Sequence, residues 1–301
     1  MAMKLSAGTF YLQDFMGEAD AVRLLAGAGF CCVDFSMEHL VDPDYVLNGP
    51  NWKRFARDLR LLGDDLGIAF NQAHAPFEFP FSKPGFMEKD AIPLTIRSLE
   101  AASILGVDTV VVHPLNFMRY CSENLNAIWD MNREFFQALL PHARACNVRI
   151  CLENLFQYDS RGVMVPGACS EPHRYVRALD ELNDPHIAAC VDVGHAALVG
   201  DKPSALIRAL GHDRLKALHI HDNNGVADAH TLPYLGGSVD WEDTCRALGE
   251  IDYDGVFTFE SFSFYKNFPP DFFPQATRFI REMGLYLTAK VDAARPKRGL
   301  S

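Results

Sequence analysis

Short apolar runs alternate along this chain with longer stretches in which apolar residues recur at every third or fourth position. The short runs are rich in β-branched and aromatic residues, which is typical of strands, and the longer stretches have the period of amphipathic helices. Eight such strand and helix units follow one another. The predicted strands are Leu5–Leu12, Cys31–Met37, Gly67–His74, Thr109–His113, Val148–Glu153, Ala188–Asp192, Ala217–His221 and Val256–Glu260.

Most of the predicted strands are apolar on both faces, which indicates a parallel sheet covered by crossover helices. A representative helix is predicted over Pro93–Leu105, where Gly106 ends the run. Neither a Pro/Gly-rich linker nor a change of composition divides the chain. The pattern therefore favours the α/β class and a single (β/α)8 TIM barrel over an open doubly wound sheet. We expect the barrel over residues 1–290 and a flexible tail over 291–301.

Length, composition and charge restrict the function. The chain has 301 residues, 49% of them hydrophobic, which is enough for one large core. The formal net charge of -11 repels nucleic-acid phosphates and anionic lipids. The sequence shows neither a secretory leader pattern nor an apolar stretch of membrane-spanning length. We therefore expect neither a nucleic acid nor a membrane as partner.

The spacing and surroundings of the cysteines indicate the cellular compartment. None of them has the CxxC spacing of a redox or zinc motif, and three lie inside apolar runs, as buried reduced thiols do. We therefore expect a cytoplasmic protein. The eight cysteines are Cys31, Cys32, Cys121, Cys146, Cys151, Cys169, Cys190 and Cys245.

Three loop segments are rich in Phe, Tyr and Pro. Two of them, 156–172 after the fifth strand and 261–274 after the eighth, are longer than a barrel needs, and the third is 77–81. Long loops at the active face of a barrel usually serve function. Packing of loops against helices explains any single aromatic residue, but together they predict a lidded apolar pocket. The same aromatic loops are also consistent with a homodimer or homotetramer.

Side chains that bind metals end six consecutive predicted strands. Catalytic residues of a barrel come from the C-terminal ends of its strands, and a charge there is costly unless it is paired or bound to a metal. Imidazole and carboxylate together suit zinc, manganese, iron or cobalt, whereas oxygen ligands alone favour magnesium or calcium. The residues are His74, His113, Glu153, Asp192 with His195, His219 with His221, and Glu260.

The two glutamates are the strongest of these candidates. Glu153 and Glu260 each follow an apolar run, so the alternation of a strand points their carboxylates into the barrel. His74 and His113 are equally well explained as semi-buried core histidines.

The remaining candidates each keep an alternative. Asp192 and His195 are separated by a turn that Gly194 permits, and they reach one site or form an orienting pair. His219 and His221 share a strand face, and we expect at most one of them to bind a metal directly. Asp228 and His230, on the following loop, form a further ligand pair or a solvated loop pair.

Several motifs in combination resemble a known family. The chain is similar to the xylose isomerase-like TIM barrel superfamily (AP endonuclease family 2), which holds sugar phosphate isomerases and epimerases, ketose 3-epimerases, inosose dehydratases and endonuclease IV-type nucleases. The resemblance covers nearly the whole chain. It is specific for the superfamily but only weakly indicates a substrate. The motifs are His-Ala-Pro at 74–76, His-Pro at 113–114, Glu-Asn-Leu at 153–155, Asp-Val-Gly-His at 192–195, His-Ile-His-Asp-Asn-Asn-Gly at 219–225, and Asp-Ala-His at 228–230 followed by Gly236-Gly237 and Asp240-Trp241.

The resemblance implies two ligand sets. The epimerase branch implies one metal, with His195 near the substrate oxygens, and a ligand set made of Glu153, Asp192, His219 and Glu260. The nuclease branch implies a multinuclear zinc site, which adds His74, His113, Asp228 and His230. Basic residues around the expected mouth are sparse, which favours a small sugar or polyol over DNA. They are Lys83, Arg119, Arg161 and Lys266.

The expected function is that of a sugar, polyol or keto acid isomerase or epimerase that uses a divalent ion (Zn, Mn, Mg or Co). The ion stabilises an enediolate while Glu153 and Glu260 remove and return a proton, and His195 or His221 shuttles protons between oxygens. The alternatives are an inosose-type dehydratase on the same site, an endonuclease IV-like phosphodiesterase and, third, a sugar-binding barrel without activity. An unphosphorylated substrate is favoured, because Gly236-Gly237 is only a faint phosphate site.

Overall fold

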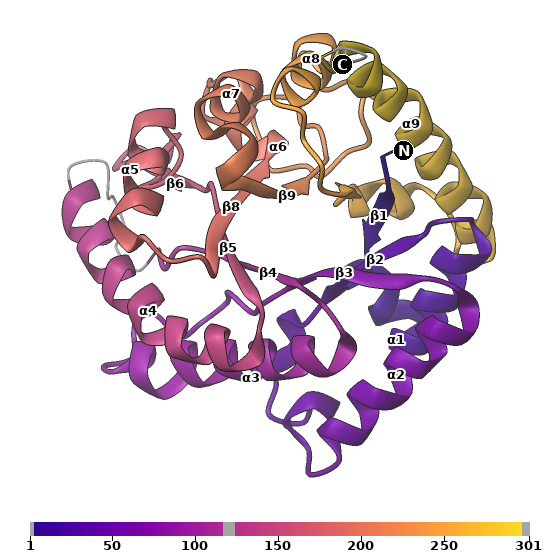
Figure 1. The fold of residues 1–301 in the computed structure, drawn as a ribbon, viewed down its shortest axis with the longest axis horizontal. Helices are drawn as coiled ribbons and strands as arrows, with labels where there is room; N and C mark the ends of the chain where they lie inside the picture. Colours follow the sequence, from indigo (N-terminus) through magenta and orange to yellow (C-terminus); the bar gives the residue numbers. More distant parts are fainter. Residues whose placement is uncertain (1–2, 117–123, 297–301) are drawn as a thin grey trace, which may run out of the picture.

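Eight parallel strands form a nearly closed barrel, and helices surround it as an outer ring (Figure 1). The computed structural model describes residues 3–116 and 124–296. Around the barrel the strands follow the order β10-β1-β2-β3-β4-β5-β8-β9, and every neighbouring pair is parallel. The strands are β1 (Leu5–Gly8), β2 (Cys32–Ser36), β3 (Ala69–His74), β4 (Thr109–Val112), β5 (Arg149–Glu153), β8 (Ile187–Asp192), β9 (Leu215–His219) and β10 (Phe257–Phe259).

The predicted barrel is therefore confirmed, and the helices that cover it lie between the strands in chain order. They are α1 (Phe10–Gly27), α2 (Trp52–Leu66), α3 (Ile92–Leu105), α4 (Leu125–Cys146), α5 (Pro172–Leu182), α6 (Val193–Leu198), α7 (Pro203–Arg214), α8 (Trp241–Glu250) and α9 (Phe273–Ala294). Shorter helices are η1 (Glu38–Val41), η2 (Val46–Asn48), η3 (Met87–Ala91), η4 (Phe262–Asn267) and η5 (Pro270–Phe272), and an antiparallel hairpin is formed by β6 (Phe156–Tyr158) and β7 (Met164–Pro166).

The barrel closes between β9 and β10 through one residue beyond β9. Ile220 donates its N–H to the carbonyl oxygen of Thr258 at 2.8 Å, and its own carbonyl accepts from the N–H of Glu260 at 3.1 Å. Glu260 is thereby fixed beside the end of β9.

Left-handed residues end the helices that precede four of the strands. Gly106, at φ 81°, ends α3, and Gly67, at φ 68°, ends α2. Asn147 and Asn183 end α4 and α5 in the same region. A residue in this conformation stops the helix and satisfies its last carbonyls, so the chain can turn back into the barrel. The helix predicted over Pro93–Leu105 and its end at Gly106 are confirmed.

Two predicted strands run two or more residues past the observed C-terminal ends, and the second, fourth and eighth each run one residue past theirs. The first strand was expected to reach Leu12, but β1 ends at Gly8 and α1 begins at Phe10. Thr9 causes the change, because its hydroxyl accepts hydrogen bonds from the Ser36 N–H and from the Gln13 side chain, at 2.9 and 3.0 Å. The seventh strand was expected to reach His221 but ends at His219.

The expected tail begins too early. Helix α9 continues to Ala294, so residues 291–294 are helical, and the side chain of Val291 within them is fully buried. Residues 297–301 of the expected tail lie outside the described part of the chain.

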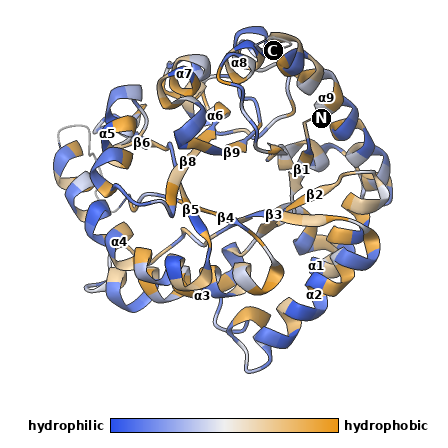
Figure 2. Cartoon of the chain, in the orientation of Figure 1, coloured by the Kyte–Doolittle hydropathy of each residue, from blue (hydrophilic) through white to orange (hydrophobic). Residues whose placement is uncertain are grey.

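Apolar side chains fill the space between the barrel and its helices. Figure 2 shows hydrophobic and hydrophilic positions alternating along the helices of the ring. Fully buried aromatic residues such as Phe35, Phe257 and Phe259 lie on the strands themselves, and burying a side chain of this size contributes about 1.5–3 kcal/mol. Among the described residues no helix is long and apolar enough to cross a membrane.

Candidate metal centre at the barrel mouth

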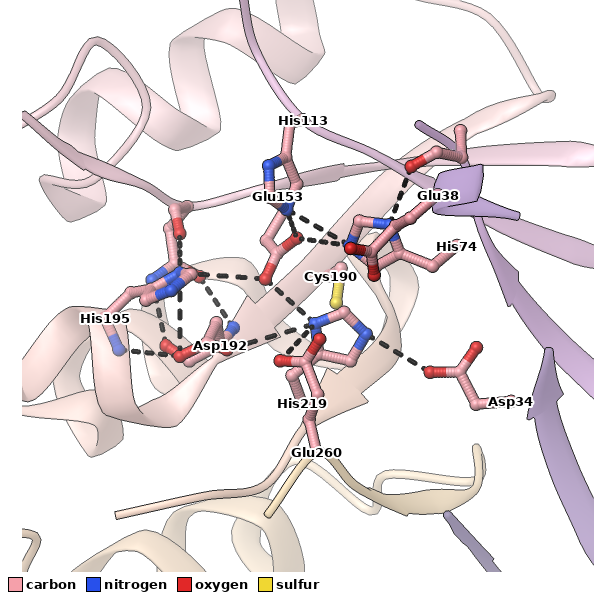
Figure 3. Close-up of polar contacts among 12 residues, drawn as sticks. Asp34, Glu38, His74, His113, Glu153, Cys190, Asp192, His195, His219 and Glu260 are labelled. Atoms are coloured by element: carbon pink, nitrogen blue, oxygen red, sulfur yellow. Dashed lines mark hydrogen bonds and ion pairs between the residues drawn. The ribbon is translucent and has the colours of Figure 1, made fainter. Parts of the chain in front are cut away.

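Four strands bring one group of side chains together at their C-terminal ends (Figure 3). Glu153, Asp192 and His219 are the last residues of β5, β8 and β9, and Glu260 follows β10. One ligand atom from each of the four lies within 4.8 Å of all the others.

His219 is the centre of this first group. Its Nδ1 lies 2.9 Å from Glu153 Oε1, 3.5 Å from Glu260 Oε2 and 3.9 Å from Asp192 Oδ2. Glu153, Asp192 and His219 have no exposed surface, and only Glu260 is partly exposed. Three carboxylates therefore converge on one buried imidazole nitrogen, and only Glu260 among them also meets the solvent-accessible side.

A second group shares Glu153 with the first. His113 Nε2 lies 2.7 Å from Glu153 Oε2, and His74 Nε2 lies 3.6 Å from the same oxygen. His74 Nδ1 contacts the carbonyl oxygen of Ala75 at 2.8 Å, so Nδ1 is the donor and Nε2 is left to face His113 Nε2 at 3.1 Å. Two imidazole nitrogens 3.1 Å apart repel each other unless one of them carries a proton or a metal ion binds there.

A third group lies on the other side of the first. Asp228 Oδ2 lies 3.3 Å from His195 Nε2 and 3.1 Å from His230 Nε2. The Nδ1 atoms of the two histidines contact the carbonyl oxygens of Asn154 and Glu260, both at 3.0 Å. Asp228 and His230 are therefore positioned by the barrel, unlike a solvated loop pair.

His221 joins the first and third groups. Its Nε2 contacts Asp192 Oδ2 at 2.9 Å, and its ring stacks on His230 with centroids 4.0 Å apart. Gly194 was expected to permit a turn, but it lies in α6, and a Cβ there would come within 2.0 Å of the His221 ring. The glycine is needed for this close approach.

The carboxylates and histidines of the three groups shift one another's pKa values. Burial opposes the charged form of Glu153, yet His219 and His113 beside it hold its pKa well below the usual range. Burial also opposes a charged His195, but Asp192, Asp228 and Glu153 outweigh it and raise the pKa of His195 to about 10. At Asp228 burial is again outweighed, by His195 and His230, and the pKa is lowered.

The donor set fits divalent metal ions. In residues 3–116 and 124–296, no lysine or arginine forms an ion pair with Glu153, Asp192, Asp228 or Glu260, so histidines are their only cationic partners. Buried carboxylates without permanent cations are the environment in which a metal replaces protons. Mixed imidazole and carboxylate ligation suits zinc, manganese or cobalt.

A cavity of about 770 Å³ opens above the three groups. Glu260, His195 and Asp228 lie on its floor and wall, and no lysine or arginine is found among the described residues that line it. Of the expected basic residues, Arg161 binds Asp159, Lys266 lies 5.3 Å over the Phe262 ring, and Arg119 lies outside the described residues.

Each aromatic loop packs one ring against one histidine of the site. Phe77 lies 4.3 Å from His113 between ring centroids, and Phe262 lies 4.2 Å from His230. Phe156, on the β6–β7 hairpin, packs against His195 at 5.3 Å. The predicted loops thus form the cavity walls and also restrict the orientation of three imidazoles.

Gly236-Gly237 was only a faint candidate for a phosphate site, and its surroundings do not suit a phosphate. A Cβ on Gly237 would meet the carboxylate carbon of Asp222 at 1.8 Å, and this carboxylate accepts hydrogen bonds from the Trp241 indole at 2.7 Å and the Val239 N–H at 3.2 Å. The glycine makes room for a buried negative charge, which would repel a phosphate group.

Sequence reasoning missed two carboxylates. Asp34 lies 3.5 Å from His219 Nε2, and Glu38 lines the cavity, where burial raises its pKa to about 7. Asp34 carries the signal that identified Glu153, a charge in an apolar run, but it lies in the middle of the run. Glu38 lies just past that run and has no signal of its own.

In a comparison with protein families, residues 22–283 match a model described as xylose isomerase-like TIM barrel. Among curated proteins, the chain is 27% identical over 158 residues to fructoselysine 3-epimerase of Escherichia coli O157:H7, covering 52% of this chain and 54% of that protein. The chain spans between 54% and 63% of the length of the curated relatives that it matches first.

Solved structures share the fold. A D-tagatose 3-epimerase-like protein superposes with a TM-score of 0.72 at 21% identity, covering 96% of this chain and 100% of that chain. The IOLI protein, solved with a bound zinc atom, gives a TM-score of 0.74 at 17% identity, covering 96% and 99%. At these identities the likeness establishes the barrel fold.

Proposed function

The chain belongs to the xylose isomerase-like TIM barrel family, and from this premise we propose that it is a divalent-metal-dependent sugar isomerase or epimerase. The observation that carries the proposal is the convergence of Glu153, Asp192 and Glu260 on His219 Nδ1, at the floor of a cavity with acidic and aromatic walls. Similarity to fructoselysine 3-epimerase and to the epimerase-like structure supports it.

Glu153, Asp192, His219 and Glu260 would hold the catalytic ion, because their ligand atoms are mutually within 4.8 Å. When bound, a divalent ion supplies Lewis acidity, which stabilises the negative charge that develops on a substrate carbonyl oxygen.

Glu260 is the carboxylate best placed to remove a proton from the carbon next to that carbonyl, because it lines the cavity. Glu153 lies 2.9 Å from the same His219 Nδ1 that Glu260 approaches, and we assign it the return of the proton. Return to the opposite face of the same carbon gives an epimer, and return to the neighbouring carbon gives an isomer.

His195 would orient the substrate oxygens. It lines the cavity, and its raised pKa makes Nε2 a hydrogen-bond donor toward Asp228 or toward a substrate oxygen. Loss of a β-hydroxyl in place of proton return would give a dehydratase on the same residues.

A second candidate is phosphodiester hydrolysis at a multinuclear zinc site. The observation that favours it is that His74, His113 and Glu153, and separately His195, His221, Asp228 and His230, also form groups of metal-binding geometry. The cavity lining argues against phosphodiester hydrolysis, because its described residues include no lysine or arginine that could bind a phosphate backbone.

The test compares Glu153→Gln and Glu260→Gln with the unaltered chain at equal, measured metal content. We expect each variant to slow deuterium exchange from heavy water into ketoses by about 10²–10⁴-fold, the size of a lost acid–base group. Glu282→Gln, on the exposed face of α9, is the matched control and should exchange at the unaltered rate. Full turnover in both site variants would rule out the proposal, and phosphodiester cleavage without exchange would favour the second candidate.

A further inference from the structure

The two ring nitrogens of His219 face different partners. Nδ1 points to Glu153, Asp192 and Glu260, whereas Nε2 points away from them to Asp34, 3.5 Å from Oδ2 (Figure 3). A histidine can bind a metal through Nδ1 only when that nitrogen carries no proton, so its proton must stay on Nε2. The group that faces Nε2 therefore decides whether the ring is ready to bind.

Asp34 is held in place for this contact. It lies on β2 with only 3% of its surface exposed, and its Oδ2 accepts a hydrogen bond from Gln72 Nε2 on β3 at 3.0 Å. The pairing of β2 with β3 shifts by one residue between Val33 and Asp34, so that Asp34 lies opposite Gln72. Irregularities of this kind re-aim a side chain next to a functional site.

Both sides of the contact have unused hydrogen-bonding capacity. In the described part of the chain, Asp34 Oδ1 and His219 Nε2 are buried atoms without a hydrogen bond of ordinary geometry. A buried polar atom without a partner destabilises the fold, so a role in the fold alone does not explain this pair. The unpaired His219 Nε2 lies 3.5 Å from the other carboxylate oxygen, Asp34 Oδ2, and a movement of a few tenths of an ångström would join these two atoms.

We propose that Asp34 is the positioning residue of the metal centre: it accepts the Nε2–H of His219 and so presents the Nδ1 lone pair to the ion. The inference rests on the proposed function, because it requires a metal held by Glu153, Asp192, His219 and Glu260. Gln72 supports the arrangement by orienting the Asp34 carboxylate. Carboxylate partners of this kind orient the imidazole and increase its basicity, and their loss weakens metal binding about 10–100-fold.

The test measures zinc affinity of the full chain by competition with a chromophoric chelator. Asp34→Asn keeps the size of the side chain and removes its charge, and we expect a 10–100-fold weaker site at unchanged zinc stoichiometry. Gln72→Met keeps the carboxylate but removes its hydrogen-bond donor, and we expect a smaller loss. Asp184→Asn, a largely buried carboxylate in the loop before β8 and so at the opposite end of that strand from Asp192, is the control and should bind like the unaltered chain.

Nitrogen-15 NMR of labelled histidines gives a second readout that a purely structural role would not change. In the zinc-loaded chain, His219 should carry its proton on Nε2, and Asp34→Asn should shift that nitrogen. Unaltered affinity in Asp34→Asn, or a proton on Nδ1 in the loaded chain, would overturn the inference while leaving the proposed function intact. A chain that binds no divalent ion would overturn both, and a zinc-bound chain without exchange activity would overturn only the function.

Discussion

Individual carboxylates of the barrel mouth differ in what balances their charge. Glu153 lies between two imidazoles, but Glu38 has its Oε1 3.4 Å from the Ser36 hydroxyl and faces the carboxylates of Glu260 and Asp34. Burial first, and then Glu260, raise the pKa of Glu38 from its ordinary 4.5 to about 7, although His74 and Ser36 act in the opposite direction. Glu38 is therefore a neutral acid in part of the physiological pH range.

This shift predicts a pH-dependent stability. A raised folded-state pKa stabilises the fold below pH 4.5, and this stabilisation is lost as the pH rises to about 7. Glu38→Gln, which stays neutral, should match the unaltered chain near pH 4.5 and exceed its unfolding free energy by about 1–3 kcal/mol at pH 8. Urea unfolding of chelator-treated protein at both pH values measures the difference, and an equal difference at both would contradict it.

At the residue level, the sequence indicated charges that end apolar strands, and the structure brings all of them to one place. It could not indicate which side chains pair. His195 and Asp228 are 33 residues apart and lie on a short helix and a loop, and no periodicity relates such positions. Asp34 was missed because a charge in the middle of a strand does not mark its end.

Helix α5 connects the two strands that carry Glu153 and Asp192. Its Tyr175 is fully buried, and the hydroxyl donates to the carbonyl oxygen of Leu152 on β5 and also contacts that of Cys190 on β8, at 2.9 Å for the latter. The Tyr175 hydroxyl thus links the C-terminal ends of β5 and β8 and fixes their spacing.

Tyr175→Phe should therefore affect both stability and the metal centre. Removal of the hydroxyl leaves two buried carbonyls without this donor, and we expect a loss of about 1–3 kcal/mol in the free energy of unfolding, with weaker zinc binding. Tyr286→Phe, about half exposed on α9, is the control and should change neither. Unchanged stability in Tyr175→Phe would show that the hydroxyl does not connect the strands.

At the level of elements, periodicity predicted that eight strands exist but not where each one ends. Strand β1 stops at Gly8 because Thr9 binds the chain of β2, and this contact between distant segments leaves no trace in the local pattern. The hairpin of β6 and β7 was not expected, since strands of three residues are too short to show alternation.

Across the whole molecule, the charge distribution restricts the substrate. The chain carries a formal charge of -11, the described cavity lining contains Glu38, Glu78, Asp228 and Glu260, and no lysine or arginine joins them there. The barrel itself was predictable, because eight consecutive strand and helix units without a linker between them are compatible with few other folds. The scarcity of basic residues at the mouth was also predictable, but the size of the cavity was not, because it depends on loops that meet only in space.

We expect an unphosphorylated ketose to be preferred over its phosphate ester. Repulsion between the ester and the carboxylates should lower kcat/KM for the phosphorylated form at least about tenfold, which corresponds to about 1.4 kcal/mol. The difference should shrink at high salt, because screening weakens the repulsion. Rates measured for a matched ester and free sugar at low and high salt check this, and a preferred ester would contradict it.

The central claim is that a divalent ion at Glu153, Asp192, His219 and Glu260 supports proton transfer at carbon. The most direct measurement is deuterium exchange from heavy water into ketoses by chelator-stripped protein, reloaded stepwise with zinc or manganese. The account predicts no exchange in the stripped chain and a rate that rises with metal until the site is filled. Exchange that is the same without metal, or absent at every metal content across the ketoses, would contradict it.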